Sequence, residues 1–355
     1  MKRSYGYSAY RGRNRGRKVL VALIIILVLV LIAALAAFFL LQSHIYFGDD
    51  GKVHIELSGS APEEGPPAPP MGTVVVVTPT PGAEETTLPR DVLDLAEIPA
   101  GESTTAETLA AQGTGGALFV MKGTGGMLTY VSRLTQAVSM GTSGANTAWN
   151  EALRAMNEEE GLYTVARVSC FRDDRAPRMN NALALRSYAG NWLDEEGVRW
   201  LNPAVPETRA YLTGICRELA ELGFDEIWLD TPCYPTNGEL ANVRVGATYD
   251  PEDLTGPVET FYEEVRAALA DYPDVKVSYT ASAEVVTGAG DESGQTMELL
   301  KEYAYRLYLP APDSSEAAAA YSSALEGMAE PVYLTDSPYL SEAPAGGKIL
   351  ASAEN

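Results

Sequence analysis

The sequence predicts an α/β fold of the (β/α)8 TIM barrel class, and three observations lead to it. Eight short apolar runs recur between residues 92 and 351, each of a length typical of a buried strand. Amphipathic segments with a helical repeat separate several of these runs, and that alternation is typical of parallel strands. Residues 91–355 span 265 positions, close to the ~250 residues of a typical barrel.

The expected elements follow one another along the chain. We expect strands at residues 92–98, 117–122, 163–171, 227–230, 275–279, 305–309, 332–335 and 348–351. We expect helices at residues 147–159, 207–222, 258–272 and 315–328, the last capped by Asp313. A doubly wound open sheet is the alternative. Residues 123–126 are rich in glycine but complete no nucleotide-binding fingerprint.

Residues 207–230 show the strand and helix signals most clearly. The expected helix 207–222 is followed by Gly223, a residue suited to the left-handed conformation at a helix C-terminus. A short apolar strand comes next and ends in Asp230, before two prolines stop it. Chemistry in such barrels lies at the C-terminal ends of the strands. Asp230 is therefore the first candidate for a catalytic group.

The residues before 91 predict a membrane anchor and a stalk. Residues 1–18 form a basic tail with seven Lys or Arg and no acid, and the 23 residues of 19–41 carry no charge. About 20 apolar residues span a bilayer, and the basic tail favours a cytoplasmic N-terminus. A cleaved signal peptide is less favoured because its apolar region is shorter. Residues 42–90 are rich in Pro, Thr and Glu and predict an extended stalk outside the cytoplasm.

Composition excludes several classes of function. The net charge is −22 and residues 1–18 hold seven positive charges, so residues 19–355 carry −29. That acidic body argues against nucleic acid or anionic polymers as ligands. The only histidines are His44 and His54, which excludes Ser-His-Asp systems and histidine-rich zinc sites from the barrel. We expect neither a metal nor a cofactor, which leaves carboxylates as the main catalytic groups.

Three cysteines fall in the predicted barrel. Cys216 lies on the apolar side of the helix 207–222, and we expect its side chain to be buried. Cys170 and Cys233 follow the third and fourth strands, so their side chains could meet. Both a disulfide and two free thiols remain open, because one of the three cysteines is unpaired in either case.

Several motifs together resemble a known family. They are Ala-Arg-Val-Ser-Cys-Phe-Arg-Asp at 166–173, Trp-Leu-Asn-Pro at 200–203 and Gly-Phe-Asp-Glu-Ile-Trp-Leu-Asp at 223–230. Over residues 90–350 the chain resembles a family of bacterial TIM barrels described as putative glycoside hydrolases, a domain of unknown function related to the alpha-amylase-like barrels. The chain departs from the family at residues 231–234, where the family has Tyr-Val-Arg-Phe, and at Thr280, where the family tends to place an acid.

The resemblance implies a role in glycosidic-bond cleavage, which needs two carboxylates. Asp230 is the expected nucleophile or base, with Asp336 or Glu284 as its partner. A structural or solvated role is the alternative for each of these acids. The expected substrate-binding residues are Lys122, Arg167, Asp173, Trp192, Trp200, Asn202, Tyr234 and Tyr279. Asp173 could instead pair with Arg167, and Trp228 is expected to pack inside the barrel.

The sequence thus supports two functions. The first is a membrane-anchored hydrolase that acts on a polysaccharide or oligosaccharide at the cell surface, held in the lipid bilayer by residues 19–41. The second is a barrel that has lost catalysis and binds carbohydrate at the envelope. A purely structural role at the envelope is a third option.

Overall fold

The computed structural model describes residues 45–47, 53–55, 95–329, 331–334 and 348–349. The chain divides into two compact units, residues 1–83 and 84–355. In the first unit β1 (Ile45–Phe47) pairs with β2 (Val53–Ile55) in antiparallel fashion. The expected membrane anchor 19–41 and most of the expected stalk 42–90 lie outside the described residues. No helix in the described part is long and apolar enough to cross a bilayer.

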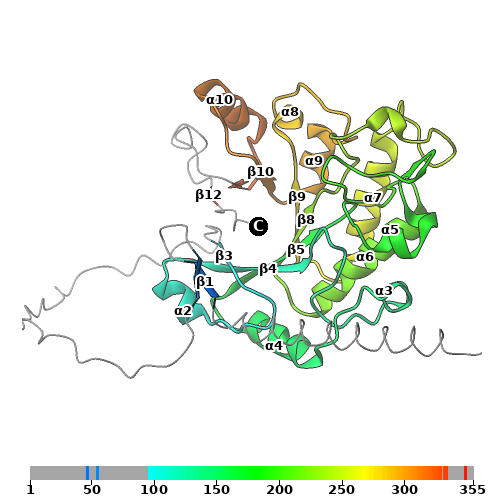
Figure 1. The fold of residues 1–355 in the computed structure, drawn as a ribbon. Helices are drawn as coiled ribbons and strands as arrows, with labels where there is room; N and C mark the ends of the chain where they lie inside the picture. The colour runs from blue at the N-terminus through cyan, green and yellow to red at the C-terminus, as the bar shows by residue number, and fades with distance from the viewer. Residues whose placement is uncertain (1–44, 48–52, 56–94, 330, 335–347, 350–355) are drawn as a thin grey trace, which may run out of the picture. The chain divides into compact units, whose positions relative to one another are not determined.

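The second unit is built on a sheet of eight parallel strands. They are β3 (Leu95–Glu97), β4 (Gly116–Lys122), β5 (Tyr163–Ser169), β8 (Glu226–Asp230), β9 (Lys276–Thr280), β10 (Leu307–Leu309), β11 (Val332–Tyr333) and β12 (Lys348–Ile349). Their spatial order follows the chain. Figure 1 shows the sheet curling into an arc. Among the described residues, pairing ends at β3 and β12, so the structure has a curled parallel sheet in which all eight expected strands are present.

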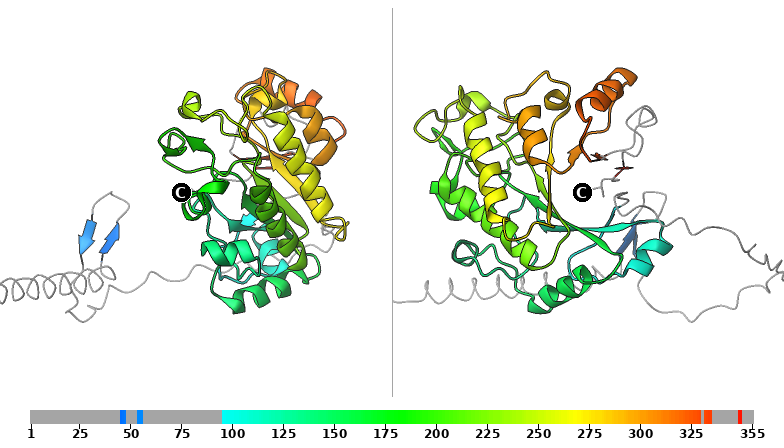
Figure 2. Two further views of the ribbon diagram at one scale, coloured as in Figure 1. Left: turned by 90° about the vertical axis from the view of Figure 1, so that its right-hand side faces the viewer. Right: turned by 180° about the vertical axis from the view of Figure 1, so that it is seen from behind.

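Helices cover the outer, convex side of this arc, as Figure 1 and the right-hand view of Figure 2 show. The longer ones are α4 (Thr147–Asn157), α6 (Pro206–Glu221), α7 (Thr255–Ala268) and α10 (Ser315–Ala324), which match the four expected helices. The cap of α10 differs from the expectation, because the Ser314 side chain, and not Asp313, accepts the Ala317 N–H at 3.1 Å.

The shorter elements were not expected from the sequence. They are α2 (Ala106–Ala111), α3 (Thr135–Met140), α5 (Ala176–Met179), α8 (Ala283–Val286), α9 (Met297–Tyr303), the 3-10 turns η1 (Asn181–Leu183) and η2 (Leu240–Asn242), and the hairpin β6 (Arg186–Ser187) and β7 (Gly190–Asn191). Helices of four to seven residues hold two turns at most, so they show almost no helical period.

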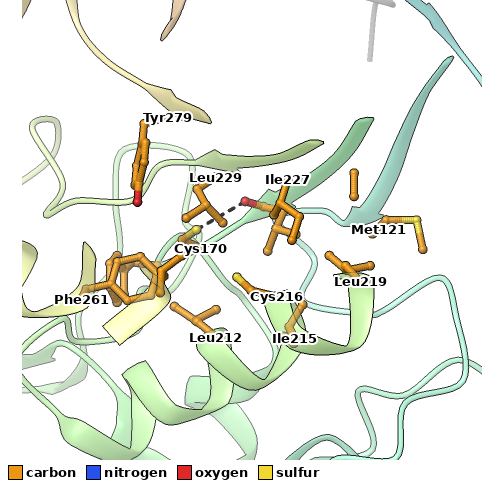
Figure 3. Close-up of a cluster of buried hydrophobic side chains, with 14 of the residues drawn as sticks. Met121, Cys170, Leu212, Ile215, Cys216, Leu219, Ile227, Leu229, Phe261 and Tyr279 are labelled. Carbon is orange, nitrogen blue, oxygen red and sulfur yellow. Dashed lines mark hydrogen bonds between the residues drawn. The ribbon is translucent and has the colours of Figure 1, made fainter. Parts of the chain in front are cut away.

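Helix α6 packs tightly against the sheet. Figure 3 shows Leu212, Ile215, Cys216 and Leu219 of α6 facing the strands, and all four are fully buried. Burial of each leucine contributes about 1.5–3 kcal/mol. The buried Cys216 agrees with the sequence expectation. This packing fixes the position of the strand that follows α6.

The turn from α6 into β8 has the conformation that the sequence predicts. Gly223 has φ +94, and its N–H donates to the Ala220 carbonyl at 3.0 Å. The Phe224 N–H donates to the Leu219 carbonyl at 3.4 Å. This pair of bonds is the Schellman arrangement, which ends a helix at a left-handed residue. The chain then enters β8 directly.

The face of the sheet away from the helices has its own core. Side chains alternate along each strand, and Leu118, Val165, Trp228 and Tyr308 form a second buried cluster on this face. The Trp228 and Tyr308 rings stack with centroids 3.9 Å apart. The expectation that Trp228 packs in the interior is confirmed.

A polar layer lies on the same face at the N-terminal end of β8. The fully buried Glu226 pairs with Arg306 at 3.2 Å. It also accepts hydrogen bonds from the hydroxyls of Tyr163 and Tyr308, at 2.8 Å and 3.1 Å. Each buried charge is therefore paired, as burial in a region of low dielectric requires. Asp230 lies at the opposite, C-terminal end of β8.

Candidate active site

Asp230 is held from both sides by the neighbouring strands. Arg167 of β5 donates to its Oδ2 through Nε at 3.0 Å and Nη2 at 2.6 Å. Thr280, the last residue of β9, donates to its Oδ1 at 3.0 Å. The strand order β5–β8–β9 produces this arrangement, because it brings the three C-terminal strand ends together on one face. Both oxygens of the carboxylate are therefore positioned.

Trp228 supports both of these partners. Its Nε1 donates to the Thr280 Oγ1 at 2.8 Å, which leaves the Thr280 hydroxyl hydrogen for Asp230. The Arg167 guanidinium lies 4.6 Å from the centroid of the Trp228 ring, in the range of a cation–π contact. Trp228 thereby fixes the orientation of the two groups that hold Asp230.

The backbone is strained immediately after Asp230. Thr231 has φ +47 and is the only non-glycine residue with positive φ in the described part of the chain. This conformation costs about 1–2 kcal/mol. It is held by the Cys170 N–H, which donates to the Asp230 carbonyl at 2.7 Å, and the Phe171 N–H, which donates to the Thr231 carbonyl at 3.2 Å. Strain of this kind clusters at functional sites.

Asp230 is nearly buried, and its partner Arg167 is half-buried. Asp230 is 8% exposed, and the Arg167 side chain beside it is 35% exposed. A carboxylate paired with a guanidinium accepts hydrogen bonds and can act as a nucleophile or base. Protonation of a leaving group would then require a second acidic group.

Of the two expected partner acids, only Glu284 lies among the described residues, and it forms no hydrogen bond or ion pair with Asp230. Glu284 is exposed in the first turn of α8. Its charge acts on Tyr321 of α10, where burial is the larger cause that raises the pKa of the phenol to about 12. Glu284 therefore lies on the side of α8 near α10. Asp336 lies outside the described residues.

Asp291 is an acid at this end of the sheet that the sequence did not single out. Its Oδ2 accepts from the Ser282 hydroxyl at 2.6 Å, and its Oδ1 accepts from the Ser293 N–H at 2.9 Å. Burial, followed by the charges of Asp291 and then Asp230, raises the pKa of the Cys233 thiol. Both carboxylates thus act on one side chain.

One feature of the sequence and one hydrogen bond of the structure bear on the position of Asp291. It follows the fifth strand in the sequence, but the short helix α8 lies between them and obscures the connection. The Tyr234 N–H donates to the Ser293 carbonyl at 2.9 Å. That bond ties the loop of Asp291 to the loop after Asp230, and the linear sequence does not reveal it.

Lys122 and Asp173 form a fully buried ion pair. The Lys122 Nζ lies 2.8 Å from the Asp173 Oδ2 and donates to the Ser169 carbonyl at 2.5 Å. The Asp173 Oδ1 accepts the N–H groups of Arg175 and Ala176, both at 2.8 Å. Asp173 thus pairs with Lys122 and not with Arg167. Both side chains are 0% exposed and offer no surface to a substrate.

The two tryptophans that were expected to bind substrate are buried. Trp192 is 2% exposed and Trp200 is 4% exposed. The Trp192 Nε1 donates to the Glu239 carbonyl at 3.0 Å, and the Trp200 Nε1 donates to the Asp194 Oδ2 at 3.0 Å. Asp194 itself is 6% exposed, which makes it part of the loop interior. The long loop between β5 and α6 folds over these rings.

The remaining expected binding residues are also enclosed. Tyr234 is 2%, Tyr279 1% and Asn202 1% exposed. The Asn202 side chain donates to the Thr248 carbonyl at 2.9 Å. These groups therefore stabilise the loops and the sheet in this structure. Of the expected binding residues, Arg167 alone contacts Asp230.

The structure also bears on the sequence expectations for the cysteines and the acids. All three cysteines are free thiols, with Cys170 and Cys216 buried and Cys233 half-buried. Within the described part of the chain, no three His, Cys, Asp or Glu side chains gather as a group that could hold a metal ion.

The chain resembles several known proteins. One solved structure is a hypothetical protein from Ruminiclostridium thermocellum ATCC 27405, with 22% identity over 48% of this chain and 86% of that chain, and a TM-score of 0.40. The PgaB (BpsB) glycoside hydrolase domain from Bordetella bronchiseptica has 13% identity over 65% and 76% of the two chains, with a TM-score of 0.45. The PelA glycoside hydrolase domain from Pseudomonas aeruginosa has 14% identity over 70% and 85%, with a TM-score of 0.40.

No curated protein matches the chain. Residues 114–308, more than half of the sequence, match the family described as "Putative glycosyl hydrolase domain". The matched range contains β4, β5, β8 and β9, and with them Arg167, Asp230 and Thr280. The chain therefore belongs to this glycosyl hydrolase family.

Proposed function

We propose that the chain is a membrane-anchored glycoside hydrolase that cleaves a polysaccharide at the cell surface. The observation that carries the proposal is Asp230, held by Arg167 and Thr280 at the C-terminal end of the parallel sheet. We also propose that the sheet closes into a (β/α)8 barrel, since eight parallel strands in chain order are the arrangement of that fold.

In this proposal Asp230 acts as the nucleophile or the general base. Arg167 and Thr280 hold the two carboxylate oxygens of Asp230 in place, and Trp228 in turn contacts Arg167 and Thr280. The acid that protonates the leaving group would be Asp336, Glu284 or the additional candidate Asp291. A separation of about 5–5.5 Å between the two carboxyl groups favours retention of configuration, and about 6.5–9.5 Å favours inversion.

A barrel that binds carbohydrate without cleaving it is the second candidate function. Thr280 favours this second function, because it occupies a position where the glycoside hydrolase family that the chain resembles tends to have an acid. The exposed position of Glu284, on the side of α8 near Tyr321, favours it as well. Such a protein would retain a polysaccharide and release no sugar ends.

The decisive experiment counts reducing ends released from a panel of bacterial wall and storage polysaccharides by the full-length chain in detergent micelles. Asp230→Asn should lower the release about a hundredfold or more. Asp271→Asn is the matched control, because Asp271 is exposed and lies just before β9, at the opposite end of the sheet. The variants Asp336→Asn, Glu284→Gln and Asp291→Asn identify the partner acid, because loss of that acid should also lower the release of reducing ends.

The outcomes separate the two functions. Release that is lost in Asp230→Asn and kept in Asp271→Asn supports the hydrolase. Retention of a polymer without release, equal in all variants, supports the binding barrel. Absence of both release and retention over the whole panel contradicts both proposals.

The proposed location rests on residues 1–41. Deletion of these residues should move the protein from the membrane fraction into the soluble fraction. Protease added to intact cells should digest residues 91–355 of the full-length chain. Protection of these residues in intact cells would contradict an extracytoplasmic location.

A further inference from the structure

A pocket of about 610 Å³ lies between the β6–β7 hairpin and the loop after β8, and we call it the hairpin pocket. Its walls include Arg178, Arg186, Arg199, Asn181 and Asn191. They come from the long loop after β5, whereas the opposite wall comes from the loop after β8. Both loops leave the C-terminal ends of their strands. The hairpin pocket therefore lies at the same end of the sheet as Asp230.

The charge of the hairpin pocket opposes that of the chain. The whole chain carries −22, yet the pocket is lined by three arginines and one acid, Glu239. Arg178 and Arg199 share the carboxylate of Asp174, each at 2.6 Å. Even with Asp174 included, the formal charge of the group is +1. The pocket is thus a local positive site on an acidic protein.

Among the three arginines of the pocket, Arg186 has no ion-pair partner among the described residues. Its Nη1 donates to the Asn191 Oδ1 at 2.8 Å, and it forms no ion pair with any residue that the structure describes. The Asn191 amide donates in turn to the Pro177 carbonyl and the Asn181 Oδ1, at 2.8 Å and 3.1 Å. The guanidinium is therefore fixed through Nη1, and its other N–H groups, which have no side-chain partner among the described residues, can bind a planar anion.

An exposed aromatic residue borders the pocket. Tyr188 is 81% exposed and stands at the tip of the hairpin, between the lining residues Ser187 and Ala189. Three other large apolar side chains on these two loops, Met179, Leu193 and Val245, are 43–58% exposed. An exposed ring beside polar groups with free hydrogen-bonding capacity is suited to a sugar, which presents an apolar ring face and polar edges.

We propose that the hairpin pocket binds a carboxylate-bearing sugar residue, such as a uronate, of the polysaccharide. Arg186 pairs with the sugar carboxylate and Tyr188 packs against a sugar ring. This inference rests on the proposed function and specifies its substrate class as acidic. Overall charge does not prevent it, because distant acids are screened beyond about 8–10 Å whereas Arg186 would contact the carboxylate directly.

The test measures binding by calorimetry to the full-length chain in detergent micelles. The Asp230→Asn background prevents cleavage during the titration. The probes are hexamers of galacturonate and of mannuronate, each compared with its methyl ester. At least one acid should bind about tenfold or more tightly than its ester, because esterification removes the charge and keeps the sugar.

Four variants test whether that difference belongs to the pocket. Arg186→Gln should abolish the preference for the acid, and Arg186→Lys should restore part of it. Arg154→Gln removes the same charge from an exposed position on α4 and should leave the preference unchanged. Tyr188→Ala should weaken acid and ester alike by about fivefold. Unchanged circular dichroism and thermal midpoints confirm that each variant is folded.

Failure of this inference is distinct from failure of the proposed function. Equal binding of each acid and its ester, or an acid preference that survives Arg186→Gln, overturns the inference. Release of reducing ends that depends on Asp230 would still support a hydrolase in that case. An acid preference that depends on Arg186, in a chain that releases no reducing ends, supports the inference and contradicts the hydrolase.

Discussion

Replacement of Lys122 by Met should destabilise the protein by about 3–5 kcal/mol, the cost of removing one member of a buried ion pair. The structure gives the reason. The Lys122 Nζ and the Asp173 Oδ2 are 2.8 Å apart, and both side chains are 0% exposed. Methionine leaves the Asp173 carboxylate buried without its counter-ion, and the Ser169 carbonyl loses a donor. Such a loss is a large fraction of a typical folding free energy of ~5–15 kcal/mol.

Urea unfolding followed by tryptophan fluorescence measures this loss. At a slope of about 2 kcal/mol/M, the midpoint should fall by about 2 M. The matched control is Lys301→Met on α9, because Lys301 is exposed. That variant should stay within about 0.5 kcal/mol of the parent.

A double variant tests the physical reason for the loss. Lys122→Met with Asp173→Asn removes both charges, and the new amide oxygen can still accept the N–H groups of Arg175 and Ala176. The double variant should therefore recover most of the stability. A single variant within 1 kcal/mol of the parent, or a double variant as unstable as the single one, would refute the buried-pair argument. An increase in KM at unchanged stability would instead place Lys122 at the substrate.

Three further predictions concern the turn, the loop and the thiols. Gly223→Ala should lower the free energy of unfolding by about 1–2 kcal/mol, because Gly223 has φ +94. The control is Gly246→Ala, which has open space at its Cβ position and should change the urea midpoint little. Asp194→Asn should lower the free energy of unfolding more at pH 7 than at pH 3. Burial opposes ionisation of Asp194, but the Arg172 and Trp200 hydrogen bonds outweigh it and lower the pKa. That stabilisation is present above the unfolded pKa of about 3.9 and is lost as pH falls through the folded value; equal losses at both pH values would contradict this assignment. Titration with a thiol reagent in urea without reductant should count three thiols, and a count of one would reveal a disulfide.

Local sequence signals predicted most of the regular structure. The eight strands and the four longer helices are found near their expected residues, since each has an apolar period that one segment carries by itself. Gly223 was predictable for the same reason, because the left-handed conformation at a helix end favours glycine. The buried position of Trp228 follows from its place within an apolar strand.

The candidate site was predicted only in part. Its first residue, Asp230, could be placed at a strand end because the signals on both sides of it are local. Its partner Arg167 is 63 residues away in the sequence, and their pairing depends on the register of β5 against β8. The distant pairing of Lys122 with Asp173 likewise has no local signal.

The sequence predicted parallel strands that alternate with helices and one acid at a strand end, because periodicity and backbone chirality act within a few residues. The strand order was left open by the sequence and is given by the structure. Which side chains of the long loops face solvent depends on the tertiary structure. The long loops after β5 and β8 bury Trp192 and Trp200 and expose Tyr188. Burial depends on how distant loops pack over one another, so only the folded chain shows the ion pairs of the site and the hairpin pocket beside it.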